Sequence, residues 1–137
     1  MLSKIFKKDF NNITYLQELL QDNPKKEWLK DGLNDEMVDI NHQDKKGNTF
    51  LMKCIKVNKK KSAAWLIQNN IDLTIQNKDG KTALFFAIEK RDRDIIKQIL
   101  KSNTVNLEQR DLYGRTLLQN IVMLGHNEMA KVLITNG

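Results

Sequence analysis

An all-α solenoid of stacked helix–turn–helix units is the fold that this 137-residue sequence predicts. Three glycines, Gly47, Gly80 and Gly114, recur at intervals of 33 and 34 residues, each inside the same short phrase. Two apolar runs with helical spacing follow each phrase, separated by a short polar turn. A fixed period of this length is the signature of repeat proteins, in which neighbouring units bury each other's apolar stripes.

The repeated phrase predicts a tight turn followed by a helix start. An Asp or Asn stands three residues before each glycine, and a Thr stands two residues after it. Asp and Asn side chains accept bonds from nearby backbone amides, glycine adopts the positive φ of a tight turn, and threonine is a favourable N-cap. The predicted turn residues are Asp44, Gly47 and Thr49; Asn77, Gly80 and Thr82; and Asp111, Gly114 and Thr116.

Two helices are predicted after each turn. The apolar positions of the first helices are Leu51, Cys54 and Ile55; Leu84, Ala87 and Ile88; and Leu118, Ile121 and Val122. Those of the second helices are Ala63, Leu66 and Ile67; Ile95, Ile96, Ile99 and Leu100; and Met129, Val132 and Leu133. Because neither helix can bury its stripe alone, stacking of the units must supply the core.

These units resemble the ankyrin repeat, whose pattern is D-x-x-G-x-T-P-L-H-x-A-A-x-x-G-H-x-E-I-V-K-L-L-L-x-x-G-A-D. The third copy follows its second half with G-H-N-E-M-A-K-V-L-I-T-N-G, which begins at Gly125. No copy keeps the Pro or the His of T-P-L-H, so we expect packing to replace the family's Thr–His hydrogen bonds. The resemblance implies an ankyrin-repeat solenoid with short β-hairpin-like loops and repeats at about 41–73, 74–107 and 108–137.

Residues 1–40 resemble a degenerate N-terminal capping repeat. Residues 12–20 have the pattern of a second helix, which the sequence Asp22-Asn23-Pro24 would end. The segment 25–35 is longer than an ordinary connection, so we expect an inserted helical turn that ends near Gly32.

Composition argues against several classes of protein. No run of 18 apolar residues exists, and the N-terminus lacks the apolar stretch of a secretory signal, so no membrane insertion is expected. The single cysteine, Cys54, cannot form an intramolecular disulfide, which favours a reducing, cytoplasmic compartment. Delivery into a host cell as an effector would be compatible with the same composition. His42 and His126 are far apart and no second cysteine joins them, so we expect no metal site.

No catalytic constellation is apparent. The repeated glycines are too widely spaced for a phosphate-binding loop. Cys54 falls at a small core position, which indicates an inert thiol, and His126 occupies the turn between two helices. Asp44 and Asp111 are turn anchors about two units apart. We therefore predict neither an enzyme nor a cofactor.

The net charge of +6 originates mainly in the middle of the chain. Residues 41–77 carry seven lysines and two aspartates, whereas residues 111–137 are neutral. A basic surface attracts nucleic acid, anionic lipid or an acidic protein, or it simply keeps a face solvated. Nineteen lysines against four arginines argue against base-specific contacts, which favour arginine.

The resemblance implies recognition of another protein through the loop tips and the exposed side of the first helices. The corresponding positions are Lys45, Lys46, Asn48, Lys56 and Val57; Lys78, Asp79, Lys81, Glu89 and Lys90; and Leu112, Tyr113, Arg115, Met123 and Leu124. This surface changes from basic to apolar and aromatic along the chain. We expect a monomeric adaptor, scaffold or inhibitor, with Tyr113 as anchor and the lysines as a steering rim.

Two other interpretations stay open. Leu112 and Tyr113 could pack on a further C-terminal segment or a neighbouring repeat. Alternatively, a basic patch could bind nucleic acid or an anionic surface, and its lysines would be Lys45, Lys46, Lys56, Lys59, Lys60 and Lys61. Phosphate binding would weaken steeply with ionic strength, whereas binding through an apolar anchor would change little.

Overall fold

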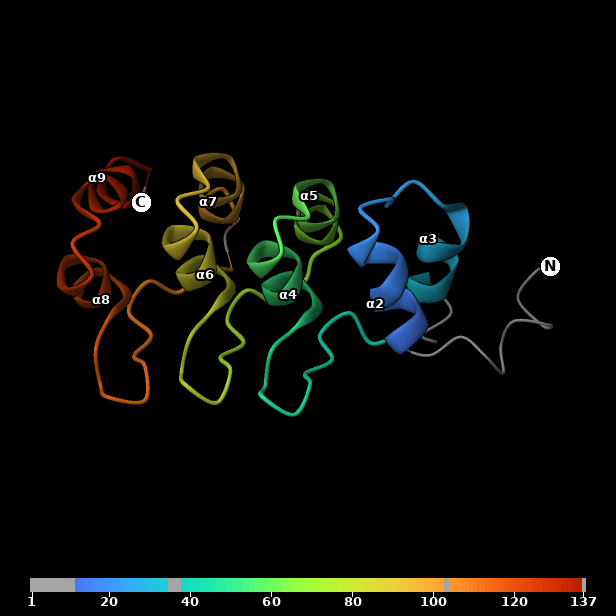
Figure 1. The fold of residues 1–137 in the computed structure, drawn as a ribbon, viewed down its shortest axis with the longest axis horizontal. Coiled ribbons are helices and arrows are strands. Elements are labelled where there is room, and N and C mark those ends of the chain that lie inside the picture. Colours follow the sequence, from blue (N-terminus) through green and yellow to red (C-terminus); the bar gives the residue numbers. More distant parts are fainter. Residues whose placement is uncertain (1–11, 35–37, 103, 137) are drawn as a thin grey trace.

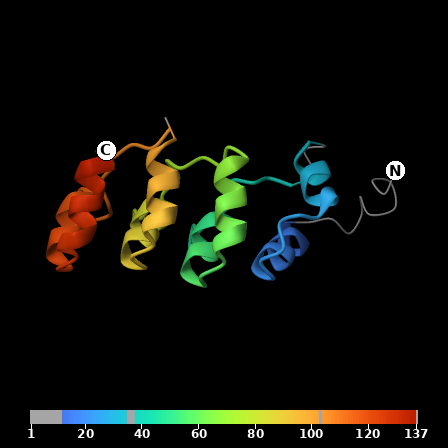
Figure 2. The ribbon, with the colours of Figure 1, turned by 90° about the horizontal axis from the view of Figure 1, so that it is seen from above.

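The computed structural model describes residues 12–34, 38–102 and 104–136, so residues 1–11 of the expected capping unit, residues 35–37, Asn103 and Gly137 lie outside the described part. Its helices are α2 (Asn12–Leu20), α3 (Glu27–Asn34), α4 (Phe50–Lys56), α5 (Lys60–Gln68), α6 (Ala83–Glu89), α7 (Arg93–Leu100), α8 (Leu117–Met123) and α9 (Asn127–Asn136). Helix pairs stack along one axis, and the loops that enter α4, α6 and α8 point to one side (Figure 1). Viewed from above, even-numbered and odd-numbered helices form two layers (Figure 2). The predicted all-α solenoid is confirmed.

The N-terminal pair differs from the prediction. The pattern of residues 12–20 suggests a second helix, whereas α2 lies in the layer of the first helices (Figure 1). Asp22 has a φ of 59° shortly after α2, just as Asn58 and Arg91 have φ values of 60° and 56° after α4 and α6. Helix α3 takes the second-helix place (Figure 1); it lies within the segment 25–35, where an inserted helical turn was expected, and it ends at Asn34, two residues after Gly32. The prediction failed because no glycine phrase precedes α2 to fix its register.

Ser62 ties this N-terminal pair to the next repeat. Its hydroxyl donates to the Leu19 carbonyl at 2.6 Å, and its amide donates to Asp22 Oδ1 at 2.9 Å. Tyr15 is fully buried, and its ring centroid lies 6.0 Å from that of Phe50. The α2–α3 pair therefore covers the N-terminal side of the core.

The core follows the predicted apolar positions in the internal repeats, but not in the last one. Leu84 and Ile88 of α6 are both 2% exposed, whereas the equivalent Leu118 and Val122 of α8 are 40% and 59% exposed. Ile121, on the inner side of α8, is buried as predicted. The expected burial of Leu118 and Val122 is wrong because no described helix pair covers the outer side of α8.

Each repeated phrase forms the same tight turn. In the first loop, Asp44 Oδ1 accepts the amides of Lys46 and Asn48, both at 2.9 Å. The Asn and the Asp at the equivalent positions accept the same two amides in the following loops. The three glycines have φ values of 79°, 76° and 75°, which favour glycine over any L-residue.

The threonines at the helix starts differ in what they bind. Thr49 Oγ1 accepts the Met52 amide at 3.3 Å, and Thr116 Oγ1 accepts the Gln119 amide at 3.3 Å. Gln119 Oε1 in return accepts the Thr116 amide at 2.8 Å, which completes a capping box. Thr82 has the extended backbone of an N-cap, but its side chain accepts no cap bond, so its expected capping role is wrong.

Thr116→Ala should therefore lower the free energy of unfolding by about 1 kcal/mol, because an amide of α8 loses its acceptor. Thr82→Ala is the matched control and should have a clearly smaller effect, since α6 loses no cap bond. Urea unfolding of both variants measures the two losses. Equal losses in the two variants would contradict the difference in capping between Thr116 and Thr82.

Candidate interaction surface

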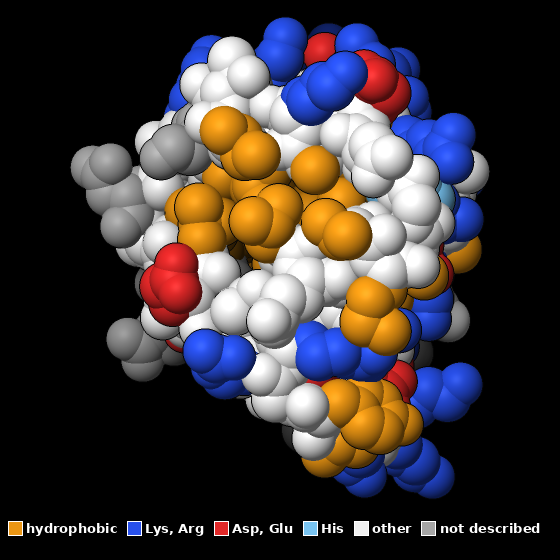
Figure 3. Space-filling view, turned by 90° about the vertical axis from the view of Figure 1, so that its left-hand side faces the viewer, with side chains coloured by type: hydrophobic (Ala, Val, Ile, Leu, Met, Phe, Trp, Pro, Cys, Tyr) orange, Lys and Arg blue, Asp and Glu red, His pale blue; other side chains and the backbone are white. Residues whose placement is uncertain are grey.

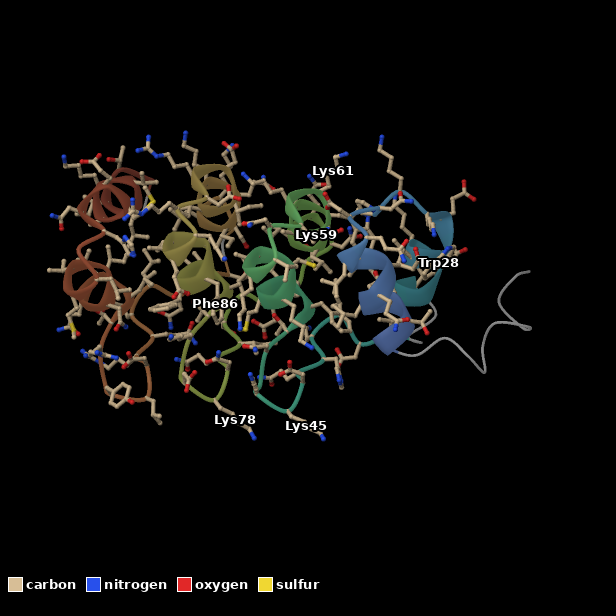
Figure 4. All side chains as sticks on the ribbon, viewed as in Figure 1. Trp28, Lys45, Lys59, Lys61, Lys78 and Phe86 are labelled. Carbon is tan, nitrogen blue, oxygen red and sulfur yellow. The ribbon has the colours of Figure 1, made fainter. Side chains whose placement is uncertain are left out.

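Most of the predicted outward residues are exposed. Lys45 and Lys78 extend away from the tips of their loops (Figure 4). Lys56 and Val57 are exposed where α4 ends, and so are the equivalent residues at the end of α6. These side chains lie on the loop side and along one edge of the first-helix layer, where a partner can approach several repeats at once.

Asn48 is an exception and corrects the prediction. Its side chain is buried, at 5% exposure, and its Oδ1 accepts a bond from Asn77 Nδ2 at 3.0 Å. It therefore joins two neighbouring loops and does not face solvent. Lys81 is only half-exposed, because its Nζ lies 4.6 Å from the ring centroid of Phe85.

The third repeat exposes a cluster of apolar side chains. Tyr113 is 75% exposed at the loop tip; its neighbour Leu112 is exposed too, as are Met123 and Leu124 at the end of α8. We call these four residues the anchor cluster. At the equivalent positions, the first two repeats carry charged side chains everywhere except at Val57.

Arg115 orders the anchor cluster. Its Nε and Nη2 each lie 3.0 Å from Asp111 Oδ2. Its guanidinium carbon lies 4.7 Å from the ring centroid of Tyr113, and its Nη1 lies 3.6 Å from Met123 Sδ. Because the carboxylate fixes the guanidinium, Tyr113 rests on a preorganised platform that restricts the freedom of its side chain.

Asp111 accepts most of the hydrogen bonds in this loop and forms its ion pair with Arg115. Burial alone would raise its pKa, but bonds from the Arg115 amide, the Asn120 side chain, the Arg115 guanidinium and the Tyr113 amide lower it to about 2. A carboxyl with a lowered pKa stabilises the fold above its ordinary pKa, near 4. That stabilisation disappears as the pH falls from about 4 toward 2.

Replacement of Asp111 tests this electrostatic role. Asn77 holds the equivalent turn in the second loop, so Asp111→Asn should keep the turn and lose only the charge. We expect the variant to be less stable than the wild type at pH 7, with a difference that shrinks below pH 4. Urea unfolding between pH 7 and pH 2 measures this. A difference that stays constant over the whole range would exclude the ion pair as its cause.

A ladder of side-chain bonds, which the sequence analysis missed, holds the loops side by side. Gln43 Nε2 donates to the carbonyls of Gly47 at 2.8 Å and Gln76 at 3.1 Å. Gln76 Nε2 donates in the same way to Gly80 at 2.8 Å and Arg110 at 2.6 Å. The 33-residue spacing of the two glutamines equals the period of the repeat, so the sequence alone could have predicted that they occupy equivalent positions. The ladder fixes the spacing of the loop tips.

The lysines of the alternative basic patch do not lie together. Lys45 is at a loop tip, whereas Lys59 and Lys61 lie at the opposite end of the repeat, beside the α4–α5 turn (Figure 4). Lys60 Nζ lies 3.6 Å from Asp92 Oδ2. A nucleic-acid backbone would have to pass across the whole height of the repeat to reach both groups.

Among the described residues, Cys54 and His126 do not come together in a catalytic arrangement. Burial, the larger effect, and the nearby charge of Asp22 raise the pKa of the fully buried Cys54 thiol to about 12. His126 Nδ1 lies 3.1 Å from Arg91 Nη2 at the surface. Across residues 12–34, 38–102 and 104–136, no group of His, Cys, Asp and Glu is arranged to hold a metal ion. The helices in these ranges also lack the length and apolar character needed to cross a membrane.

Comparisons with known proteins agree with this architecture. A family model described as ankyrin repeats in three copies matches residues 8–111, which takes in the N-terminal pair. A solved ankyrin repeat protein superposes on this chain with a TM-score of 0.76 and 26% sequence identity. The superposition covers 93% of this chain and 63% of the solved protein's chain. A putative ankyrin repeat protein of Acanthamoeba polyphaga mimivirus is 30% identical over 72% of this chain, which spans 13% of that protein. An I-kappa-B like protein of Microplitis demolitor bracovirus is 31% identical over 82% of this chain and 69% of its own length.

Proposed function

This chain belongs to the ankyrin-repeat family, whose repeats generally mediate protein–protein interaction, and we propose that it is a non-enzymatic module that binds a partner protein. In this role it would act as an adaptor, scaffold or inhibitor.

The proposal rests mainly on the anchor cluster. Solvent-facing positions that hold charged residues in the earlier repeats, Val57 excepted, hold Leu112, Tyr113, Met123 and Leu124 in the third. Tyrosine, methionine and arginine are enriched at interfaces, and contiguous exposed apolar side chains are typical of binding sites. A large, preorganised ring beside apolar neighbours has the properties of a binding hot spot.

The same surface indicates the chemistry of the partner. An apolar pocket would receive Tyr113, and an acidic rim would face the basic loops that carry Lys45 and Lys78. Lysines at the rim raise the rate of association with an acidic surface and contribute little to the final affinity. We therefore propose a partner whose apolar pocket is bordered by acidic side chains.

Substitution of Tyr113 tests the proposal. With a partner isolated by affinity capture on the intact protein, we expect Tyr113→Ala to weaken binding at least about tenfold, since truncation of an anchor costs about 2 kcal/mol or more. Its melting temperature should stay unchanged, because the side chain is largely exposed. Lys45→Ala, the control at the rim, should mainly change the salt dependence of the association rate.

The opposite pattern would contradict the anchor model. If lysine substitutions abolish binding, Tyr113→Ala leaves it intact and the affinity falls steeply with salt, the protein binds nucleic acid or another anionic surface instead.

A further inference from the structure

One buried acceptor in the third repeat lacks a donor. Gln109 Nε2 donates to the Thr74 carbonyl at 2.6 Å, which fixes the orientation of the amide, because a reversed amide would place two oxygens against each other. Gln109 Oε1 is buried, and no group in the described ranges donates a hydrogen bond to it. Leaving such an oxygen unpaired costs free energy, so a donor is required that the neighbouring side chains do not supply.

The period of the repeat shows that this amide departs from the second copy. Gln109 stands five residues before the loop glycine, and the equivalent residue of the second repeat is Ile75. Ile75 packs against the hydrophobic core. The third repeat therefore carries a polar side chain at a position where the preceding repeat makes an apolar contact.

Thr82, at the start of α6, is a second departure. The threonines at the same position of the other two repeats each accept an amide of their own helix through Oγ1. Thr82 has the same extended backbone, but its side chain accepts no cap bond. Its hydroxyl can therefore bind a group outside the helix, as donor or as acceptor.

Both departures meet at a small cavity between the second and third repeats. The cavity has a volume of about 20 Å³, and Thr82 and Gln109 both line it. Apolar side chains gather on the outer end of the molecule, formed by α8 and α9 (Figure 3). The cavity lies on the other side of α8, where Asn120 of that helix and Phe85 of α6 contribute to its wall. It is therefore separate from the apolar outer surface.

The size and the lining of the cavity determine which molecule fits. Roughly 10–15 Å³ suffices for one water molecule, provided that two to four polar groups surround it. Gln109 Oε1 has no hydrogen to give, so its ligand must be a donor, which excludes an anion. Lys81 and Arg115 also line the cavity, and their charges disfavour a metal cation. A small neutral molecule that can donate and accept meets these conditions.

We propose that this cavity is a binding site for one ordered water molecule, which bridges Gln109 Oε1 of the third repeat and the Thr82 hydroxyl of the second. Asn120 Nδ2 donates to Asp111 Oδ2 and to the Thr116 carbonyl, so Asn120 Oδ1 remains as a further acceptor for the water. With these three groups the water has the number of partners that is usual for a buried water. The bridge replaces the apolar contact of Ile75, and it does not depend on the binding of a partner protein.

Nuclear magnetic resonance of the isotope-labelled 137-residue protein tests the proposal. We expect cross-relaxation between the water resonance and two groups at the cavity, the side-chain amide protons of Gln109 and the methyl protons of Thr82. The cross-peaks should have opposite signs in NOESY and ROESY spectra, which marks a water molecule that tumbles with the protein. Absence of these cross-peaks in the wild-type protein would overturn the proposal.

Substitutions of similar shape provide the controls. Thr82→Val removes the hydroxyl without removing a cap bond and should abolish the cross-peaks at Gln109, whereas Thr82→Ser should keep them. Gln109→Met keeps the Thr82 hydroxyl and should abolish the cross-peak at the Thr82 methyl group. Persistence of that cross-peak in Gln109→Met would overturn the proposal, because the signal would then come from exchange of the hydroxyl proton.

A high-resolution crystal structure of the wild-type protein provides a second measurement that needs no variant. We expect electron density for a single water molecule within hydrogen-bond distance of both Gln109 Oε1 and Thr82 Oγ1. A metal ion at this place, or a protein group that donates directly to Gln109 Oε1, would overturn the proposal.

Discussion

Gly80→Ala is expected to destabilise the protein by about 3 kcal/mol or more, whereas Gly114→Ala should cost only about 1–2 kcal/mol. Both glycines have nearly the same φ, 76° and 75°, so alanine meets the same backbone strain at each. The two glycines differ in the space available to an added Cβ atom. A Cβ on Gly80 would lie 2.5 Å from the Leu112 nitrogen and 2.6 Å from Asp111 Cα, which are backbone atoms of the next loop.

Urea unfolding of the two variants separates these effects. Gly114→Ala measures the strain alone, and the additional loss in Gly80→Ala measures the clash between neighbouring loops. Gly47→Ala should fall between them, because its nearest backbone atom would be 2.9 Å away. Equal losses at Gly80 and Gly114 would contradict the close stacking of the second and third loops.

Cys54 should react at least about tenfold more slowly with a thiol reagent in the folded protein than in the unfolded protein. Its side chain is fully buried, and burial is the main reason that its pKa rises from 9.0 to about 12. Each pKa unit lowers the thiolate fraction about tenfold, and the thiolate is the reactive species. Reagent access is restricted as well.

The labelling rate in buffer and in concentrated urea provides this comparison. Because the protein has one cysteine, the signal needs no further assignment. A folded-state rate within tenfold of the unfolded-state rate would show an accessible thiol and would reopen the question of a reactive cysteine.

The turns could be predicted from the sequence because their chemistry is local. An Asp or Asn that binds amides two and four residues ahead, followed by a glycine with positive φ, forms the same turn in each copy. The apolar period likewise predicts the buried faces of α4 to α7, since each of these helices lies between neighbours on both sides.

Features that depend on a neighbouring repeat could not be predicted in the same way. Asn48 looks like a surface residue in its own loop and is buried only because Asn77 of the next loop binds it. The stripe of α8 looks like a core stripe, yet Val122 is exposed because no described helix covers it. The register of α2 was missed because its unit lacks the glycine phrase. The Gln43 and Gln76 ladder was detectable, since the two residues share the period of the repeat.

Site-specific photo-cross-linking tests the central claim, that the third repeat holds the partner, most directly. A photoreactive phenylalanine analogue replaces Tyr113 in one sample and the equivalent residue of the second repeat, Asp79, in another. Irradiation in lysate should yield a discrete protein adduct from position 113 and none from position 79. Adducts from position 79 alone, or adducts that contain nucleic acid, would contradict an apolar anchor in the third repeat.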